Sequence, residues 1–143
     1  MNNKKIVQDS LREARRKKEK PSDYTVMIVD DSAMDRKIMR NTIEPLGVNI
    51  VEAKDGVEAL QMLKTNEVDA MLIDIEMPRM DGYTLAQEIR KYNKYRKLPL
   101  IAVTSRATKS DRVRGVEVGM NEYITKPYTP EYLQNVVRRN LKL

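Results

Sequence analysis

The stretch Ala70–Pro78 (AMLIDIEMP) decides the fold class of this 143-residue chain. Four apolar residues in a row end on the carboxylate of Asp74, and a short unbroken run of this kind is typical of a buried strand in a parallel sheet. Ligands in open α/β sheets collect beyond the carboxyl ends of the strands, where Asp74 would lie. Pro78 cannot continue a strand ladder, so we expect the chain to turn away there. Taken alone, Asp74 would more simply cap a strand-to-helix turn.

Apolar, strand-like segments alternate with amphipathic, helix-like segments along the rest of the chain. The predicted strands lie at 26–29, 49–53, 70–74, 99–104 and 123–125. The predicted helices begin near Ser32, Asp55, Asp81, Lys109 and Pro130. Five strand–helix units indicate an α/β fold, (βα)5, a three-layer sandwich in which helices cover both faces of a parallel sheet. We expect the flavodoxin-like strand order 2-1-3-4-5, which makes the first and third strands neighbours.

The composition limits the chemistry that this chain can perform. It contains no cysteine and no histidine, which excludes disulfides, thiolate or imidazole metal ligands and Ser-His catalysis. Its length is sufficient for one domain with a substantial core. Any chemistry must therefore use carboxylates, hydroxyls, lysine and an oxygen-preferring metal ion, and we expect no organic cofactor.

The net charge of +6 is concentrated near the start of the chain. Residues 1–22 hold eight basic and three acidic residues and are predicted to be a basic flexible leader or linker, although a partner-binding arm or an RNA-binding tail would also fit. Residues 23–143 hold 19 basic and 18 acidic residues and form the predicted domain, whose near-neutral charge argues against nucleic-acid binding. We find no membrane-spanning apolar run and no signal peptide, so we expect a cytoplasmic protein.

Three carboxylates are predicted to meet at one edge of the sheet. Asp30 and Asp31 follow the first strand and Asp74 ends the third, which is its expected neighbour. Two unit charges about 4 Å apart repel by about 4 kcal/mol at an effective dielectric constant near 20. A hard divalent cation, Mg²⁺ (or Mn²⁺), relieves this repulsion and also accepts phosphoryl oxygens as ligands. The sequence therefore predicts a metal site at this edge.

A hydroxyl group and a cation are predicted at the same edge. Thr104 ends the fourth strand, and Lys126 follows the fifth. A nucleophilic carboxylate, a metal ion, a lysine and a hydroxyl are the parts that an aspartyl-phosphate site needs, and the small Ser105 leaves room for a phosphoryl group. Each residue alone has a simple structural explanation, but together they favour a functional site.

These motifs resemble the receiver domains of two-component response regulators. The matching segments, in the family's order over about residues 24–140, are Val29–Ser32 (VDDS), Leu72–Pro78 (LIDIEMP), Met80–Gly82 (MDG), Val103–Ser105 (VTS) and Lys126–Tyr128 (KPY). The residues around Thr104–Arg106 and Asn121–Tyr128 are most similar to receivers attached to chemotaxis histidine kinases or coupling proteins. The resemblance implies a signalling domain that catalyses only its own phosphorylation and dephosphorylation, not an enzyme.

The resemblance implies the roles of the acidic residues. Asp74 would be the phosphoacceptor of a phosphorelay. Asp30, Asp31 and Asp74 would bind Mg²⁺, with the backbone carbonyl of Glu76 as a further ligand.

The resemblance also implies phosphoryl contacts and a switch. Thr104 and Lys126 would contact the phosphoryl group, and the Lys126–Pro127 peptide bond would be cis, which proline tolerates. Tyr123 would turn inward as the Thr104 hydroxyl moves onto a phosphoryl oxygen. From the residues alone, Tyr123 is an ordinary amphipathic edge residue.

The absence of histidine means that the phosphoryl group must come from another domain or a small phosphodonor. The resemblance implies a histidine kinase or a histidine phosphotransfer domain as the donor. It places a downstream protein at the face made by the fourth helix, the fifth strand and the fifth helix. Candidate residues there are Arg112, Val116, Tyr123 and Tyr132. The chain ends three residues after Asn140, so no DNA-binding domain is expected.

Phosphoryl lifetime depends on the two side chains expected to overhang the site. Glu76 lies two residues beyond Asp74, and Arg106 lies two beyond Thr104. We hypothesise that these opposite charges pair across the site and obstruct the hydrolytic water. The alternative is two solvated side chains, because exposed pairs are weak.

Three other functions stay open from the sequence. The domain could be a phosphate sink without an output partner, or a non-phosphorylated interaction scaffold with the same fold. It could also be a haloacid-dehalogenase-like phosphatase, but such an enzyme would need Asp-x-Asp spacing after the first strand. Here Asp30 and Asp31 are adjacent.

Overall fold

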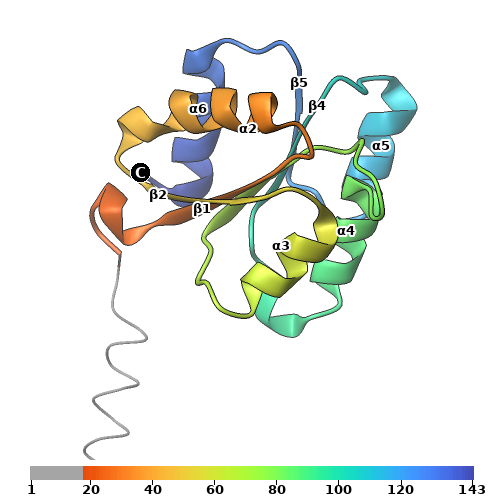
Figure 1. Cartoon of the computed structure of the whole chain (residues 1–143), viewed down its shortest axis with the longest axis horizontal. Coiled ribbons are helices and arrows are strands. Elements are labelled where there is room, and N and C mark those ends of the chain that lie inside the picture. Colours follow the sequence, from red (N-terminus) through yellow and green to blue (C-terminus); the bar gives the residue numbers. More distant parts are fainter. Residues whose placement is uncertain (1–17) are drawn as a thin grey trace, which may run out of the picture.

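The computed structural model describes residues 18–143, so most of the predicted leader at 1–22 lies outside the described residues. In chain order the elements are η1 (Pro21–Asp23), β1 (Thr25–Val29), α2 (Ala33–Ile43), η2 (Glu44–Leu46), β2 (Asn49–Ala53), α3 (Gly56–Leu63), β3 (Ala70–Ile73), α4 (Gly82–Arg90), η3 (Asn93–Tyr95), β4 (Leu100–Thr104), α5 (Lys109–Glu117), β5 (Glu122–Thr125) and α6 (Pro130–Leu141), where η marks a short 3-10 helix. Strands and helices alternate as predicted (Figure 1).

The strands form one parallel sheet in the order β2-β1-β3-β4-β5. This order confirms the predicted flavodoxin-like (βα)5 fold. β3 is buried along its whole length, as its unbroken apolar sequence indicates. β1 lies between β2 and β3, so the two strands that lead to the acidic residues are neighbours.

Helices cover both faces of the sheet (Figure 1). α2 and α6 pack on one face, over the alternate strand residues Val26, Ile28, Leu72 and Val103. α3 and α4 pack on the other face over their neighbours in the strands, such as Met27 and Ile73, and the residues that follow α5 complete this second cluster. The alternation follows from the two-residue period of a strand, which sends successive side chains to opposite faces.

Capping side chains fix where the five helices begin. The side chains of Ser32, Asp55, Asp81, Thr108 and Thr129 each accept the backbone N–H three residues further along. The first three are the predicted starting residues. The other two come immediately before the predicted starts at 109 and 130.

Gly82 brings α4 against the strand that carries the central aspartate. A Cβ atom on Gly82 would lie 2.5 Å from the backbone oxygen of Asp74 and 2.9 Å from Cα of Ile75. Any larger residue would push the start of α4 away from the end of β3. The Asp81–Gly82 pair therefore both caps the helix and permits its close approach to the site.

Ordered contacts begin before the predicted domain boundary at residue 23. Lys18 forms ion pairs with Glu67 and Asp69, and Asn49 Nδ2 donates to the Ser22 carbonyl oxygen at 2.8 Å. Across residues 18–143, no helix combines the length and apolar character that crossing a membrane requires.

Candidate functional site

The strand register brings the acidic residues together. Val29 pairs with Ile73 across the β1–β3 ladder, so Asp30 and Asp74 leave their strands at the same level. The Asp74 N–H donates to the Val29 carbonyl oxygen at 2.9 Å, which holds the two chain exits together. This proximity follows directly from the predicted strand order.

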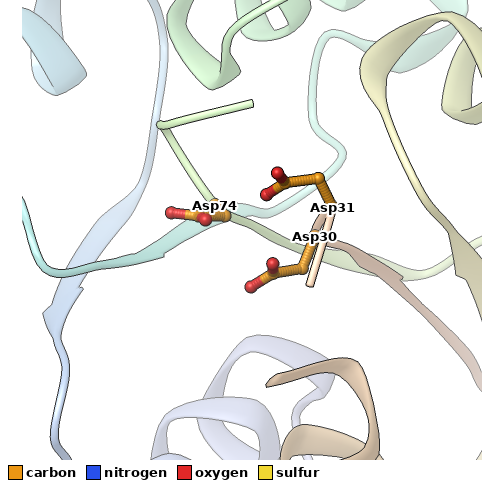
Figure 2. Close-up of side chains that lie close together, drawn as sticks. All are labelled: Asp30, Asp31 and Asp74. Carbon is orange, nitrogen blue, oxygen red and sulfur yellow. The ribbon is translucent and has the colours of Figure 1, made fainter. Parts of the chain in front are cut away.

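Asp30, Asp31 and Asp74 form one carboxylate cluster at the carboxyl edge of the sheet (Figure 2). One carboxylate oxygen from each residue lies within 4.8 Å of the others. Asp30 and Asp74 are buried, whereas Asp31 is exposed. Within residues 18–143, no hydrogen bond or ion pair engages the Asp31 carboxylate. Three oxygen donors, one of them without a protein partner, fit a hard cation such as Mg²⁺.

Lys126 reaches this cluster from the end of β5. Thr104 and Thr125 are partners in the β4–β5 ladder, so the residue after Thr125 emerges beside the end of β4. Lys126 Nζ lies 2.8 Å from Asp30 Oδ2 and 3.8 Å from Asp74 Oδ2. Burial alone would lower the pKa of Lys126, but its hydrogen bonds to carboxylates outweigh burial and raise the pKa. Lys126 is therefore a fixed cation at the site.

The ionised form of Asp74 is disfavoured by its surroundings. Burial, with the nearby Asp30 carboxylate adding to it, raises the pKa of Asp74 to about 6, although Lys126 opposes the shift. The Thr104 hydroxyl and the Glu76 backbone N–H favour the charged form of Asp74 and lower its pKa, but they are smaller influences than burial. A divalent cation between the carboxylates would remove the repulsion that this arrangement retains.

The sequence matches the family described as response regulator receiver domain over residues 26–138. The chain belongs to this receiver family. A receiver is a signalling module rather than a catalytic enzyme, which excludes the haloacid-dehalogenase-like phosphatase. Within the described residues, the carboxylate cluster is of the kind that binds magnesium in receivers.

Two relatives place this receiver near chemotaxis proteins. It is 61% identical over 128 residues to the sensor histidine kinase CheAY of Helicobacter pylori, an alignment that covers 88% of this chain and 16% of the kinase. The chain therefore spans about a sixth of that protein's length. It is 39% identical over 111 residues to the chemotaxis protein CheY homolog of Campylobacter jejuni, covering 76% of this chain and 85% of that protein.

A solved receiver structure has the metal that the cluster fits. It is the receiver domain of the sensor histidine kinase PA1611 from Pseudomonas aeruginosa, which has a magnesium ion coordinated in its active-site cleft. The TM-score is 0.77 at 29% sequence identity, and the match covers 84% of this chain and 98% of that one.

Two residues near the receiver site were not predicted to take part in it. Asp35 Oδ2 lies 2.9 Å from Lys126 Nζ, so the lysine is held by carboxylates from two sides. Arg36 Nη1 donates to the Asp30 carbonyl oxygen at 2.7 Å. Both lie in the first turn of α2, and their closeness to Asp31 in the sequence was the available signal.

The predicted pairing of Glu76 with Arg106 is wrong. Within the described part of the chain, no ion pair joins these side chains. Arg106 Nη2 instead lies 3.2 Å from Asp111 Oδ1, and Glu76 is exposed. Asp111 lies five residues beyond Arg106 in the first turn of α5, so a local partner is available without crossing the site.

The Lys126–Pro127 peptide bond is cis.

Proposed function

We propose that this receiver accepts a phosphoryl group on Asp74 from a phosphohistidine of a histidine kinase or a histidine phosphotransfer domain. The observation that carries the proposal is the Asp74 carboxylate, which lies among two further carboxylates with Lys126 Nζ 3.8 Å away. Membership of the receiver family supports the same role.

The proposed transfer is a single displacement at phosphorus. A carboxylate oxygen of Asp74 attacks, so that a P–O bond forms as the P–N bond of the phosphohistidine breaks. The leaving imidazole keeps the electron pair of the broken bond and takes up a proton from solvent. Lys126 and Thr104 would bind the phosphoryl oxygens that Asp74 acquires.

The proposed metal ligands are Asp30, Asp31, Asp74 and the Glu76 backbone carbonyl. When bound, Mg²⁺ would neutralise the charge that the carboxylates and the phosphoryl oxygens bring together. The chain's own residues orient this group: the Ser32 N–H donates to Asp30 Oδ1 at 2.9 Å, and Lys126 holds Asp30 Oδ2. Asp31 would complete the set with little reorganisation, because nothing in the described residues competes for it.

The donor would approach across the exposed edge beside Lys126. A pocket of about 300 Å³ lies there, lined by Asp35, Ile38, Lys126, Pro127 and Tyr128. Met34 and Ile38 on α2 are 72% and 49% exposed, so this helix offers apolar surface to a donor domain. Phosphohistidine on a kinase is formed from ATP, and the receiver must meet its donor in the same compartment. We therefore propose that the receiver acts in the cytoplasm.

We infer that the output of this receiver is the α5–β5–α6 face and that its context is chemotaxis. The names of the CheAY and CheY relatives support that context. Val116 is 74% exposed on α5, and Tyr132 is exposed on α6, so this face offers apolar surface to a downstream protein. Thr104 and Tyr123 would connect the face to Asp74. This exposed surface favours an output module over a phosphate sink.

Intact-mass spectrometry tests the proposed function. We expect the wild-type protein to gain one phosphoryl group from acetyl phosphate only with Mg²⁺ present, and Asp74→Asn to gain none. Glu117→Gln, which removes an exposed carboxylate on α5, should behave as wild type. A folded protein that takes up nothing from acetyl phosphate or from a phosphohistidine domain would overturn the proposal and favour the scaffold. Uptake that persists in Asp74→Asn would also overturn it.

A further inference from the structure

Two hydrogen bonds connect Thr104, at the receiver site, to Tyr123 through the backbone of Arg106. The Thr104 hydroxyl, which favours the charged form of Asp74 and so lowers its pKa, accepts the Arg106 backbone N–H at 3.2 Å. The Arg106 carbonyl oxygen in turn accepts the Tyr123 hydroxyl at 2.7 Å. The Tyr123 ring packs against the core cluster under α4 and α5. Its hydroxyl is therefore connected through Arg106 to Thr104 at the receiver site.

Tyr83 in α4 contacts the far side of the Tyr123 hydroxyl. The two phenolic oxygens are 3.1 Å apart, and Tyr83 also donates to the Asp111 carbonyl oxygen at 2.9 Å. Tyr83 is only 3% exposed, so its hydroxyl must find partners inside the protein. The Tyr123 hydroxyl thus sits between a backbone carbonyl and a buried phenol.

Gly115 leaves the space that the Tyr123 ring occupies. A Cβ atom on Gly115 would lie 2.9 Å from Cδ2 and 3.2 Å from Cε2 of Tyr123. Gly115 lies inside α5, where glycine lowers helix stability relative to alanine. The guanidinium of Arg112, also on α5, lies over the same ring, 5.5 Å from its centroid. The helix therefore carries an unfavourable residue at the position where any side chain would displace the ring.

We propose that Tyr83 and Gly115 are positioning residues that hold Tyr123 inward before any phosphoryl group is bound. This inference rests on the proposed function, because it concerns the residue that would transmit the state of Asp74. In the unphosphorylated protein, the output face would then already have Tyr123 in its inward position. Phosphorylation would then stabilise a ring position that is already populated, rather than turn the ring inward.

The expected effects differ because the two residues act differently. The two hydroxyl protons serve three contacts, so the shortest contact, to Arg106, takes the Tyr123 proton, and the Tyr83 proton is divided between Asp111 and Tyr123. Losing the Tyr83 hydroxyl should therefore raise the outward population of Tyr123 by about fivefold at most. Alanine at Gly115 overlaps the ring itself and should make the outward arrangement predominant.

NMR of the unphosphorylated protein, labelled with ¹³C only in its tyrosine rings, tests the proposal. The Tyr123 signal is assigned from Tyr123→Phe, and its exposure is measured by relaxation from a soluble gadolinium chelate. Tyr132, which is 48% exposed, and the buried Tyr83 provide the two reference values. We expect Tyr123 in the wild type to be protected and to become exposed in Gly115→Ala. Tyr83→Phe should give an intermediate value.

Two matched controls separate positioning from general loss of structure. Tyr95→Phe also removes a phenol that donates to a backbone carbonyl, at 3.0 Å to Leu63, but it lies away from Tyr123. Glu117→Ala introduces alanine into α5 without touching the ring. Neither should change the Tyr123 signal.

The outcome is independent of phosphoryl transfer. A Tyr123 ring as exposed as Tyr132 in the wild type would overturn the proposal, as would a Tyr123 signal unchanged in both Gly115→Ala and Tyr83→Phe. If Gly115→Ala does not fold, Tyr83→Phe alone decides. A protected ring in a protein that takes up no phosphoryl group would leave these positioning roles intact and overturn only the proposed function. Adding acetyl phosphate and Mg²⁺ should change the wild-type exposure less than twofold and the Gly115→Ala exposure more.

Discussion

At the amino ends of the strands, polar side chains form hydrogen bonds with the backbone of the neighbouring strand. At the carboxyl ends, carboxylates of like charge lie close together. Asp69 precedes β3 and accepts the Thr25 N–H at 2.8 Å, and Asn121 precedes β5 and accepts the Leu100 N–H at 2.8 Å. Each also gives its own N–H to the carbonyl of the same neighbour. At the opposite edge, Asp30 and Asp74 are both buried close to Asp31.

The amino edge of the sheet stabilises the fold, whereas the carboxyl edge serves function at a cost in stability. A polar side chain whose hydrogen bonds are satisfied within the protein stabilises the fold, and a carboxylate that is buried near other carboxylates does not. Proteins retain the second arrangement where a ligand or a reaction uses it. Substitutions at the two edges should therefore change stability with opposite signs.

The largest expected loss comes from Arg90, which organises the amino edge. Its guanidinium donates to the carbonyl oxygens of Gly119 and Tyr95 and to Asn121 Oδ1, at 2.7 to 3.1 Å. Arg90→Met keeps the aliphatic packing but removes the donor of the Gly119 carbonyl oxygen and one of the two donors to each of the Tyr95 carbonyl oxygen and Asn121 Oδ1, so we expect the free energy of unfolding to fall by about 3 kcal/mol. Urea unfolding followed by circular dichroism measures this.

Arg138→Met is the matched control for Arg90. Arg138 is an exposed arginine that bonds Asn135. Its loss should change the free energy of unfolding by less than about 0.5 kcal/mol. Equal effects of the two substitutions would mean that the amino edge does not depend on this network.

The next effect has the opposite sign and comes from Asp74. Because the folded-state pKa is raised to about 6 from an ordinary value of 3.8, the folded protein binds this proton more tightly than the unfolded chain does. Stability from this group is therefore present below about pH 4 and is lost as pH rises through 6. Without divalent cations, Asp74→Asn should be more stable than wild type by about 2 kcal/mol at pH 8.

The advantage of Asp74→Asn should disappear under two conditions. At pH 4 the wild-type carboxyl is protonated, so the two proteins should unfold at similar urea concentrations. With Mg²⁺ at pH 8 the wild type should recover, because the cation replaces the missing neutralisation. An advantage that is the same at pH 4 and pH 8 would mean that charge repulsion is not its cause.

The carboxyl edge was predictable from sequence because strand order alone brings its residues together. Five apolar runs and their helix caps specified a parallel sheet, and the register of such a sheet places Asp30 level with Asp74. Lys126 and Thr104 followed from the same rule. Backbone geometry, rather than side-chain conformation, decided each of these positions.

The contacts that depend on side-chain direction were not predictable in this way. Arg106 turns to Asp111 rather than to Glu76, and nothing in residue spacing distinguishes the two carboxylates. Tyr83 looked like one more apolar position on α4, although its hydroxyl reaches Tyr123. Gly115 could be explained only once the ring beside it was placed.

The smallest expected effect is at Glu122, which begins β5 on the amino edge. The hydrogen bond from Arg139, with a further one from Asn140, lowers the pKa of Glu122 despite partial burial. A lowered folded-state pKa means that its stabilisation is present above about pH 4.5 and is lost as pH falls below that value. Because Arg139 is exposed, Glu122→Gln should cost less than about 1 kcal/mol at pH 7.

The pH dependence of the Glu122→Gln effect distinguishes the two edges better than the size of that effect does. The difference in stability between wild type and Glu122→Gln should shrink as the pH falls from 7 towards 3. The difference for Asp74→Asn has the reverse sign and should shrink as the pH falls from 8 to 4. Paired urea titrations across this range measure both. If Glu122 and Asp74 both stabilised the fold at pH 7 without metal, the proposed difference between the two edges would be wrong. Burying the ionised carboxylate of Asp74 would then cost no stability.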